Sequence, residues 1–240
     1  MPVHGFFLGG CCGGTPLNLI VGPRIPRHGR RTDHSRIQEV REGTSGNTRA
    51  FQSDPSLWDY LFVGPFTSAA GFHRWLRECT TNPDTAFVAI RDLASGACTG
   101  MASYLRIAPE AGSIEVGNIC FGPALQRTKA ATEAMYLMMK WAFDAGYRRY
   151  EWKCNALNMP SRRAAQRLGF SYEGIFRQAL VVKGRNRDTA WFAIIDKEWP
   201  ALREAYAAWL APANFTVAGK QRESLADLTR LVRAASDPLV

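Results

Sequence analysis

The sequence has 240 residues, of which 46% are hydrophobic and 11% aromatic, which is typical of a soluble domain with a real core and excludes a wholly disordered chain. Its formal net charge of +9 indicates an anionic partner, which could be nucleic acid, a phosphate-bearing cofactor or a membrane surface. Part of this charge is local, because seven Arg and only three acidic residues lie between Gly22 and Arg49. That stretch has almost no apolar periodicity, so we expect a poorly ordered basic arm.

The cysteines and histidines give no sign of a metal site. The six Cys include no Cys-x-x-Cys pair, and Cys120 and Cys154 lie in apolar runs, where Cys usually acts as a small core residue. We therefore expect a reducing, cytoplasmic compartment without structural disulfides. All four His precede residue 74, so we expect no His-ligated metal in the later part of the chain.

No segment resembles a membrane span or an export signal. Phe6–Val21 is mildly apolar, but it is rich in Gly and too short to cross a bilayer. It also lacks a preceding basic stretch, which makes it a poor signal peptide. We expect three parts: a basic Gly/Pro/Arg-rich extension over residues 1–50 with at most one edge strand near Leu17–Val21, a main domain over 51–210, and a C-terminal helical extension over 211–240.

The first half of the main domain predicts two helices and a hairpin. An aromatic-rich stretch favours a short helix with a loop, and Ser68 is typical of the N-cap of the next helix. Two β-rich runs then flank a turn at Leu93–Gly96, which is the pattern of a β-hairpin. In chain order we expect the helix and loop at Pro55–Phe66, a helix carrying Phe72, Trp75, Leu76 and Cys79 on one face, and strands at Thr85–Asp92 and Ala97–Ile107.

The chain is organised around one predicted strand, turn and helix. Ile114–Phe121 is an apolar, β-rich run, and apolar residues recur at helical spacing over Ala131–Ala145, with Gly146 as a C-terminal cap. The start of a helix presents free N–H groups and a positive dipole end, which suits a phosphate. Arg127 and Lys129 add positive charge at the same place. An ordinary strand–helix junction with a charged turn would explain these residues equally well.

The rest of the chain continues the alternation of strands and helices. In chain order we expect a strand at Arg148–Cys154, a helix at Ser161–Leu168 ended by Gly169, strands at Phe170–Val182 and Asp188–Asp196 joined by the turn Lys183–Arg187, and helices at Trp199–Leu210 and Ser224–Ala235. This order predicts an α/β protein in which helices pack on one mixed sheet.

Four motifs, in the expected order between residues 85 and 199, resemble the GNAT (Gcn5-related) N-acetyltransferases. Within that superfamily the chain is most similar to the branch of ribosomal-protein N-terminal acetyltransferases and their uncharacterised relatives. The motifs are Gln126–Ala131 in the place of (Gln/Arg)-x-x-Gly-x-(Gly/Ala), Thr132-Glu133-Ala134 directly after it, Asn158-x-x-Ser161 followed by Gly169-Phe170 and Glu173-Gly174, and Arg177 followed by the basic turn Gly184–Arg187, Asp188 and Glu198-Trp199.

The resemblance implies a fold, a cosubstrate and a set of binding residues. The fold would be a strongly bent mixed sheet with helices on both faces, and acetyl-CoA would lie between splayed fourth and fifth strands, here Ser113–Phe121 and Arg148–Cys154. Asn158 and Ser161 would meet the pantetheine arm or the thioester. The pyrophosphate would be wrapped by the backbone N–H groups of Gln126, Arg127, Thr128, Lys129, Ala130, Ala131 and Thr132.

Two positions depart from the family pattern. Lys129 stands where the motif has Gly, and a glycine there permits a backbone shape that Lys resists. Ala165 stands where many relatives have a Tyr that protonates the departing thiolate. That role would pass to Ser161, to water or to the product amine.

Transfer to an amine needs a neutral amine, so a base or a water relay is expected. Glu115 is the acid inside the apolar strand, where partial burial would raise its pKa. It also occupies the family position of a catalytic glutamate, although a solvent-facing strand Glu is the alternative. Asn118, three residues on, would face the other side of a regular strand. The resemblance implies a β-bulge in this strand, which would change that parity and make Asn118 a substrate contact.

Aromatic and basic residues supply further candidates. Trp58 and Tyr60, with Phe66, could line an acceptor pocket, although an aromatic cluster is more often core. Arg162 and Arg163 could reach the adenosine phosphates, or could simply be solvated.

The sequence thus predicts an acyltransferase that moves acetyl from acetyl-CoA to a primary amine by direct attack in a ternary complex. The acceptor could be a small molecule or a protein N-terminus, and the chain a monomer or a homodimer. A non-catalytic CoA-binding or regulatory module is the first alternative. A nucleic-acid binder, suggested by the +9 charge and the arginine arm, ranks last because the arm lacks interleaved aromatics.

Overall fold

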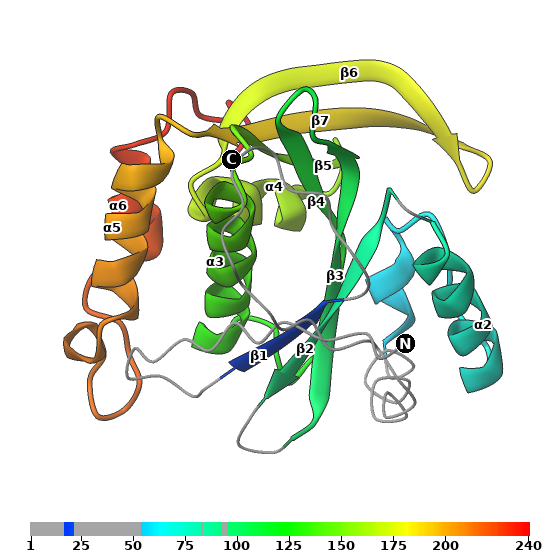
Figure 1. The fold of residues 1–240 in the computed structure, drawn as a ribbon, viewed down its shortest axis with the longest axis horizontal. Coiled ribbons are helices and arrows are strands. Elements are labelled where there is room, and N and C mark those ends of the chain that lie inside the picture. The colour runs from blue at the N-terminus through cyan, green and yellow to red at the C-terminus, as the bar shows by residue number, and fades with distance from the viewer. Residues whose placement is uncertain (1–16, 22–53, 83, 93–95) are drawn as a thin grey trace.

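The computed structural model describes residues 17–21, 54–82, 84–92 and 96–240 (Figure 1). The predicted basic arm at 22–49 therefore lies outside the described residues. The elements are β1 (Leu17–Val21), η1 (Pro55–Trp58), α2 (Ala69–Thr80), β2 (Ala86–Asp92), β3 (Cys98–Ala108), β4 (Ser113–Phe121), α3 (Lys129–Asp144), β5 (Arg149–Asn155), α4 (Met159–Arg167), β6 (Ser171–Val182), β7 (Arg185–Ile195), α5 (Trp199–Leu210), η2 (Pro212–Asn214) and α6 (Leu225–Arg230).

The strands form one seven-stranded sheet in the order β1-β2-β3-β4-β5-β7-β6. Within it β4 and β5 pair in parallel, and the other neighbours pair antiparallel. The parallel pairing runs from Ser113 opposite Arg149 to Val116 opposite Trp152 and stops there, although both strands continue. The predicted splay of the fourth and fifth strands of the family fold is thereby confirmed.

A β-bulge bends β4 where it leaves β5. Met101 lies opposite Cys120 and Ser103 opposite Gly117, so β4 carries one residue more than β3 over this stretch. Asn118 takes up the excess with a φ of 49°, in the left-handed region that Asn tolerates better than most residues. Its amide donates to Ser103 Oγ (2.9 Å), and that hydroxyl donates to the Gly117 carbonyl (3.2 Å). The predicted bulge is therefore present, and side chains fix it.

Helices cover both faces of the sheet, as Figure 1 shows for α3 and α5 on one side and α2 on the other. On the α3 face, Tyr104 of β3 is 1% exposed and donates its hydroxyl to the Met138 carbonyl of α3 (2.9 Å). On the α2 face, Trp75 meets Phe87 of β2 edge to face, with 5.4 Å between the rings. The predicted layering of helices on a mixed sheet is confirmed.

Local capping explains most of the helix boundaries. Ser68 accepts from the Gly71 N–H and caps α2, as predicted. Gly146 follows α3 with a φ of 92°, which is the usual role of Gly after a helix. The helix predicted from Ser161 begins two residues earlier, because Asn158 Oδ1 accepts from the Ser161 N–H and serves as the N-cap.

Two predicted boundaries in the last third were wrong. The turn between β6 and β7 is only Lys183-Gly184, with φ values of 49° and 74°, and this two-residue geometry matches the twist of a hairpin. The final helix covers Leu225–Arg230, so the rest of the predicted Ser224–Ala235 segment is irregular.

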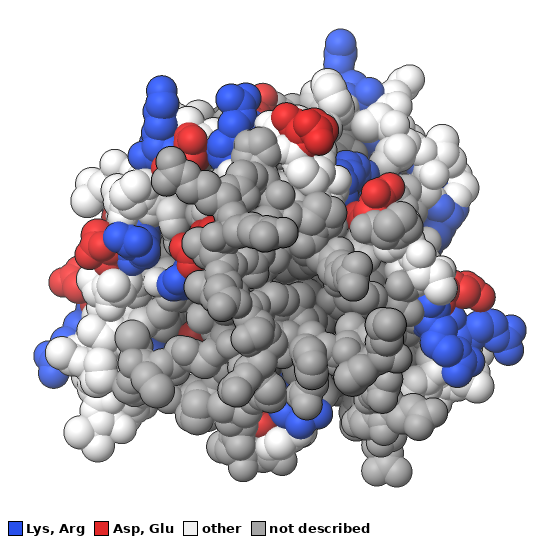
Figure 2. All heavy atoms as spheres, viewed as in Figure 1, with Lys and Arg blue, Asp and Glu red and all other residues white. Residues whose placement is uncertain are grey.

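Two observations bear on a membrane or a nucleic acid as partner. Among the described residues no helix is long and apolar enough to cross a bilayer. Around the described rim of the face in Figure 2, Lys and Arg alternate with Asp and Glu. A nucleic-acid backbone calls for clustered basic side chains, and that face does not gather them in its described part.

Residues 211–240, predicted as an extension, pack closely on the main domain. Arg162 of α4 and Asp237 are each 2% exposed, and the guanidinium donates to both carboxylate oxygens at 2.6 Å. The prediction that Arg162 reaches phosphate or solvent was therefore wrong. A bidentate pair of this kind is strongly directional, so it fixes the C-terminal segment against α4.

We expect Asp237→Ala to lower the free energy of unfolding by about 3–5 kcal/mol, because it leaves the buried Arg162 without its counterion. Urea unfolding at neutral pH measures this. The double variant Arg162→Met/Asp237→Leu should recover most of the loss. Arg163→Met, at the exposed next position, should cost under about 0.5 kcal/mol. If it costs as much as Asp237→Ala, Arg162 and Asp237 are not a special structural pair.

Candidate functional site

A cleft of about 1580 Å³ opens where β4 and β5 part. Its walls come from β4, from the starts of α3 and α4, from β7, and from the segment after η1. Most of the predicted site residues lie on it: Tyr60, Glu115, Asn118, Gln126, Arg127, Thr128, Lys129, Ala131, Thr132, Asn158 and Ser161. The tertiary structure thus brings together residues that the sequence separates by up to a hundred positions.

The start of α3 leaves part of its backbone open to the cleft. The N–H groups of Gln126 and Thr128 donate to the Gly122 and Leu125 carbonyls, and that of Ala131 donates to Thr128 Oγ1 (3.1 Å). The N–H groups at positions 127, 129 and 130 have no acceptor within the described part of the chain. A helix start with uncommitted N–H groups suits an anion, so the N–H groups at 127, 129 and 130 keep that capacity.

The Lys that replaces the motif Gly fits without backbone strain. Lys129 is the first residue of α3, and the left-handed residue is Arg127, with a φ of 59°. The Lys129 ammonium donates to the Leu210 carbonyl at the end of α5 (2.9 Å) and lies 4.3 Å from the centre of the Phe215 ring. Its charge therefore complements the negative end of α5.

One further arginine reaches the same end of the cleft. Arg167, in the last turn of α4, donates to Thr132 Oγ1 (3.1 Å) and stacks 5.3 Å from the Trp209 ring. Burial lowers the pKa of Arg167, because a guanidinium loses hydration there. No local pattern in the sequence points to Arg167, because its partners come from α3 and α5.

The start of α4 presents a hydroxyl at the opening between the strands. Ser161 Oγ accepts from Trp152 Nε1 (3.1 Å), so its own hydrogen remains available for donation. Ala165, on the same helix, is fully buried and offers no polar group. Of these two positions on α4, only Ser161 carries a hydroxyl, and its role as proton donor stays a prediction.

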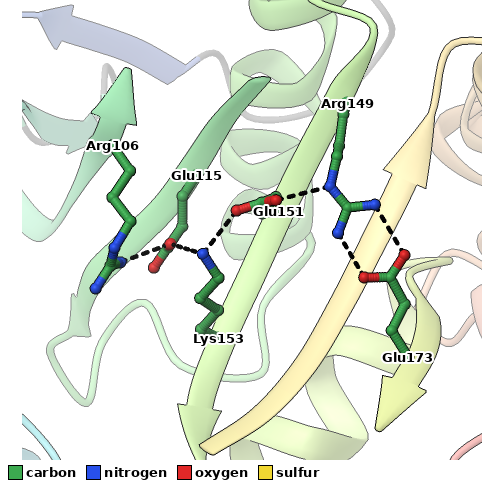
Figure 3. A network of polar contacts seen from close by, with 6 residues as sticks. All are labelled: Arg106, Glu115, Arg149, Glu151, Lys153 and Glu173. Atoms are coloured by element: carbon green, nitrogen blue, oxygen red, sulfur yellow. Dashed lines mark hydrogen bonds and ion pairs between the residues drawn. The ribbon is translucent and has the colours of Figure 1, made fainter. Parts of the chain in front are cut away.

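Glu115 lies in a row of alternating charges rather than in apolar surroundings (Figure 3). It is 3% exposed, and its Oε2 meets Arg106 Nη1 at 2.6 Å and Lys153 Nζ at 2.9 Å. No described residue donates to Oε1. That oxygen lies beside Gly117, because a Cβ added there would stand 3.8 Å from it. The free oxygen therefore points to the place where β4 leaves β5.

The row continues across β5 and β6. Lys153 also contacts Glu151 Oε2 (2.7 Å), and Arg149 bridges Glu151 Oε1 (2.6 Å) to Glu173 (2.8 Å). Burial alone would raise the pKa of Glu151, but hydrogen bonds from Lys153 and Arg149 hold it below its ordinary value. The hydrogen bond to Glu173 raises the pKa of Arg149. Glu151 and Arg149 are therefore held in their charged forms.

Because the pKa of Glu151 is lower in the folded state, its ionised form stabilises the fold above the unfolded pKa, and this contribution is lost as the pH falls through the folded value. We expect Glu151→Gln to flatten the loss of stability between about pH 5 and about pH 3, measured by urea unfolding. Asp144→Asn, which removes one partner of the exposed pair with Lys140, should leave the acid limb unchanged. If the unfolding free energies of wild type and Glu151→Gln fall in parallel as the pH is lowered, Glu151 does not make this contribution.

The aromatic candidates separate into cleft and core. Tyr60 is 40% exposed, lines the cleft and donates its hydroxyl to the Leu157 carbonyl (3.3 Å). Trp58 is 2% exposed and packs edge to face on Phe66, with 5.1 Å between the rings. The prediction that its indole lines an acceptor pocket is corrected: the ring fills the core beneath α2.

No group of three or more His, Cys, Asp or Glu among the described residues could hold a metal ion. The four described cysteines, Cys79, Cys98, Cys120 and Cys154, are free thiols. The cleft itself presents open N–H donors at one end and paired charges with one free carboxylate oxygen at the other.

Comparison with known proteins agrees with this geometry. The family model described as Acetyltransferase (GNAT) domain matches residues 38–171. The crystal structure of a GCN5-related N-acetyltransferase from Brucella melitensis is 41% identical, covers 95% of this chain and 96% of its own, and has a TM-score of 0.81. That of a probable GNAT acetyltransferase from Chromobacterium violaceum is 38% identical, covers 76% and 98%, and has a TM-score of 0.64.

A more distant structure, that of the ribosomal L7/L12 alpha-N-protein acetyltransferase RimL, is 19% identical, covers 62% of this chain and 83% of its own, and has a TM-score of 0.54. At that identity the likeness concerns the fold alone. No curated protein sequence matches this chain.

Proposed function

Because the chain belongs to the GNAT family of acetyltransferases, we propose that it moves the acetyl group of acetyl-CoA to a primary amine in a ternary complex. The observation that carries this proposal is the cleft that opens at the end of the β4–β5 pairing. It joins a helix start with open N–H groups to a buried carboxylate with one free oxygen. Acetyl-CoA would supply the thioester, and the residues of this chain would bind it and handle the protons.

The start of α3 would hold the pyrophosphate. The N–H groups at positions 127, 129 and 130 have no acceptor in the described chain, and the exposed Arg127 side chain lies on the cleft wall. Both features favour an anion. The edge of β4 beyond Val116 has no strand paired on the β5 side, so its backbone is open to the pantetheine arm and the thioester.

Glu115 Oε1 would take the proton from the attacking amine, directly or through water. Its Oε2 already holds Arg106 and Lys153, and these contacts fix the carboxylate so that Oε1 stays at the opening. The neighbouring charges are themselves offset, since Lys153 also pairs with Glu151 and Arg106 is 55% exposed to water. Positioning of this kind is what a general base requires.

Ser161 would relay a proton to the sulfur, giving up its hydroxyl proton and regaining one from water. As the amine nitrogen bonds to the acetyl carbon, the carbon–sulfur bond breaks and the thiolate needs a proton. The Ser161 hydroxyl accepts from Trp152 and keeps its own hydrogen for donation. Its location at the opening of the strands supports this role in place of the family Tyr.

We expect Arg127→Glu to weaken acetyl-CoA binding about 10-fold or more, because a negative charge would stand beside the pyrophosphate. Isothermal calorimetry measures the affinity, and thermal unfolding shows whether the fold is intact. Arg148→Glu, an exposed charge reversal beyond the other end of α3, is the matched control. Equal affinities of the two variants would mean that the phosphates do not bind at the start of α3.

We expect Glu115→Gln to bind acetyl-CoA normally and to turn over about 10²–10⁴-fold more slowly, the usual worth of a positioned general base. Raising the pH should recover part of the loss, because more of the amine is then neutral. The measurement is a pH–rate profile of thiol release with one good acceptor amine. Profiles that coincide in shape and height would assign proton removal to water alone. Binding of CoA without acceptor-dependent thiol release by the wild type would instead indicate a non-catalytic module.

A further inference from the structure

One face of β7 carries hydrogen-bonding atoms that are buried and unpaired. Arg187 Nε and Nη1, Thr189 Oγ1 and Trp191 Nε1 each lack a hydrogen-bond partner among the described residues. These residues alternate along the strand, so their side chains lie on one face of the sheet. All three line the cleft. Buried polar atoms are nearly always paired, and three neighbouring exceptions in one cleft indicate a ligand.

Arg187 is the most unusual of the three. It is 6% exposed, and no described acidic side chain forms an ion pair with it. The guanidinium forms a cation–π contact with the Phe62 ring, whose centre lies 4.6 Å from the guanidinium carbon. Burial lowers the pKa of Arg187. A buried cation without a counterion is costly, and the buried Arg162 differs in that it pairs with Asp237.

Arg187 lies on the face of the sheet opposite to the one that α3 and α4 cover. Trp191 pairs with Lys153 in register, and Lys153 Nζ lies 3.8 Å from the centre of the Trp191 ring. Lys153 contacts Glu115 from the same side, whereas Trp152, one residue earlier, turns to Ser161 of α4. The unpaired atoms therefore share a face with the proposed base and not with the proposed phosphate site.

The β6–β7 hairpin closes this part of the cleft against the segment after η1. In Figure 1 the hairpin extends beyond the sheet towards that segment, and at its tip Lys183 Nζ donates to the Trp58 carbonyl (2.8 Å). Phe62 of the same segment packs on Arg187. This part of the cleft is therefore enclosed and rich in hydrogen-bond donors, and it lies on the side of the opening that the acceptor amine would occupy.

We propose that Arg187, with Trp191 and Thr189, binds an oxyanion group, carboxylate or phosphate, on a small acceptor amine whose nitrogen reaches Glu115. This proposal rests on the proposed acetyl transfer, since it names the class of acceptor. The oxyanion would supply the missing counterion, accept the indole N–H and hold the amine in one orientation. A small zwitterionic or phosphorylated amine meets these conditions, and a simple alkylamine does not.

The test compares ω-amino carboxylates with n-alkylamines of the same length, and O-phosphoethanolamine with ethanolamine, as acceptors for the full-length protein with acetyl-CoA. We expect kcat/KM to favour the anionic member of at least one pair by about 10- to 100-fold, the worth of a charged hydrogen bond. The preferred pair distinguishes carboxylate from phosphate. Arg187→Met should abolish the preference, while acetyl-CoA affinity stays unchanged.

Two further variants keep the test decisive. Arg185→Met, an exposed arginine two residues earlier on β7, should retain the preference. Trp191→Phe keeps the ring on Lys153 but removes the indole N–H, and should reduce the preference by less than Arg187→Met does. Both remain informative if Arg187→Met does not fold.

Binding of the same compounds to the CoA-bound protein, measured by calorimetry, separates the two proposals. Arg187-dependent binding of an anionic amine without acetyl transfer would support the oxyanion site and contradict the proposed reaction. Acetylation of the anionic acceptors at equal rates by wild type and Arg187→Met, or no preference for the anionic member of either pair by the wild type, would support the reaction and overturn the oxyanion site. No binding of any anionic amine would also overturn it.

Discussion

The parting of β4 from β5 is the constraint on which the rest of the structure depends. Parallel pairing ends at Val116 and Trp152, and the bulge at Asn118 turns β4 away. The strained φ of Asn118 is held by the hydrogen bonds through Ser103. Without this parting the sheet would be closed, and the start of α3 and the carboxylate of Glu115 would lie on opposite sides of a continuous barrier.

The buried charged side chains differ in how far other residues supply their counterions, and this difference separates structural from functional roles. Arg162 and Asp237 neutralise each other completely, as expected for a pair that only holds two segments together. Glu115 is neutralised on one oxygen and left open on the other. Arg187 has no counterion among the described residues. Since an unpaired buried charge is destabilising, the location of Arg187 in the cleft supports the proposed oxyanion partner.

The C-terminal segment does more than extend the domain. Phe215 and the end of α5 receive the Lys129 ammonium, and Trp209 carries the Arg167 guanidinium. These contacts shape the end of the cleft at the start of α3. The replacement of the motif glycine by lysine is thus matched by residues some eighty positions later in the chain.

Local patterns in the sequence were enough for the elements that depend on neighbouring residues. The caps at Ser68 and Gly146, the β4 strand and α5 follow from short-range rules, and the four spaced motifs were enough for the family. Partners brought together by the fold could not be read in this way. Lys153 beside Glu115, Asp237 beside Arg162 and the isolation of Arg187 depend on strand register and on packing between distant segments, and a side chain's charge in the sequence does not reveal whether the fold supplies its counterion.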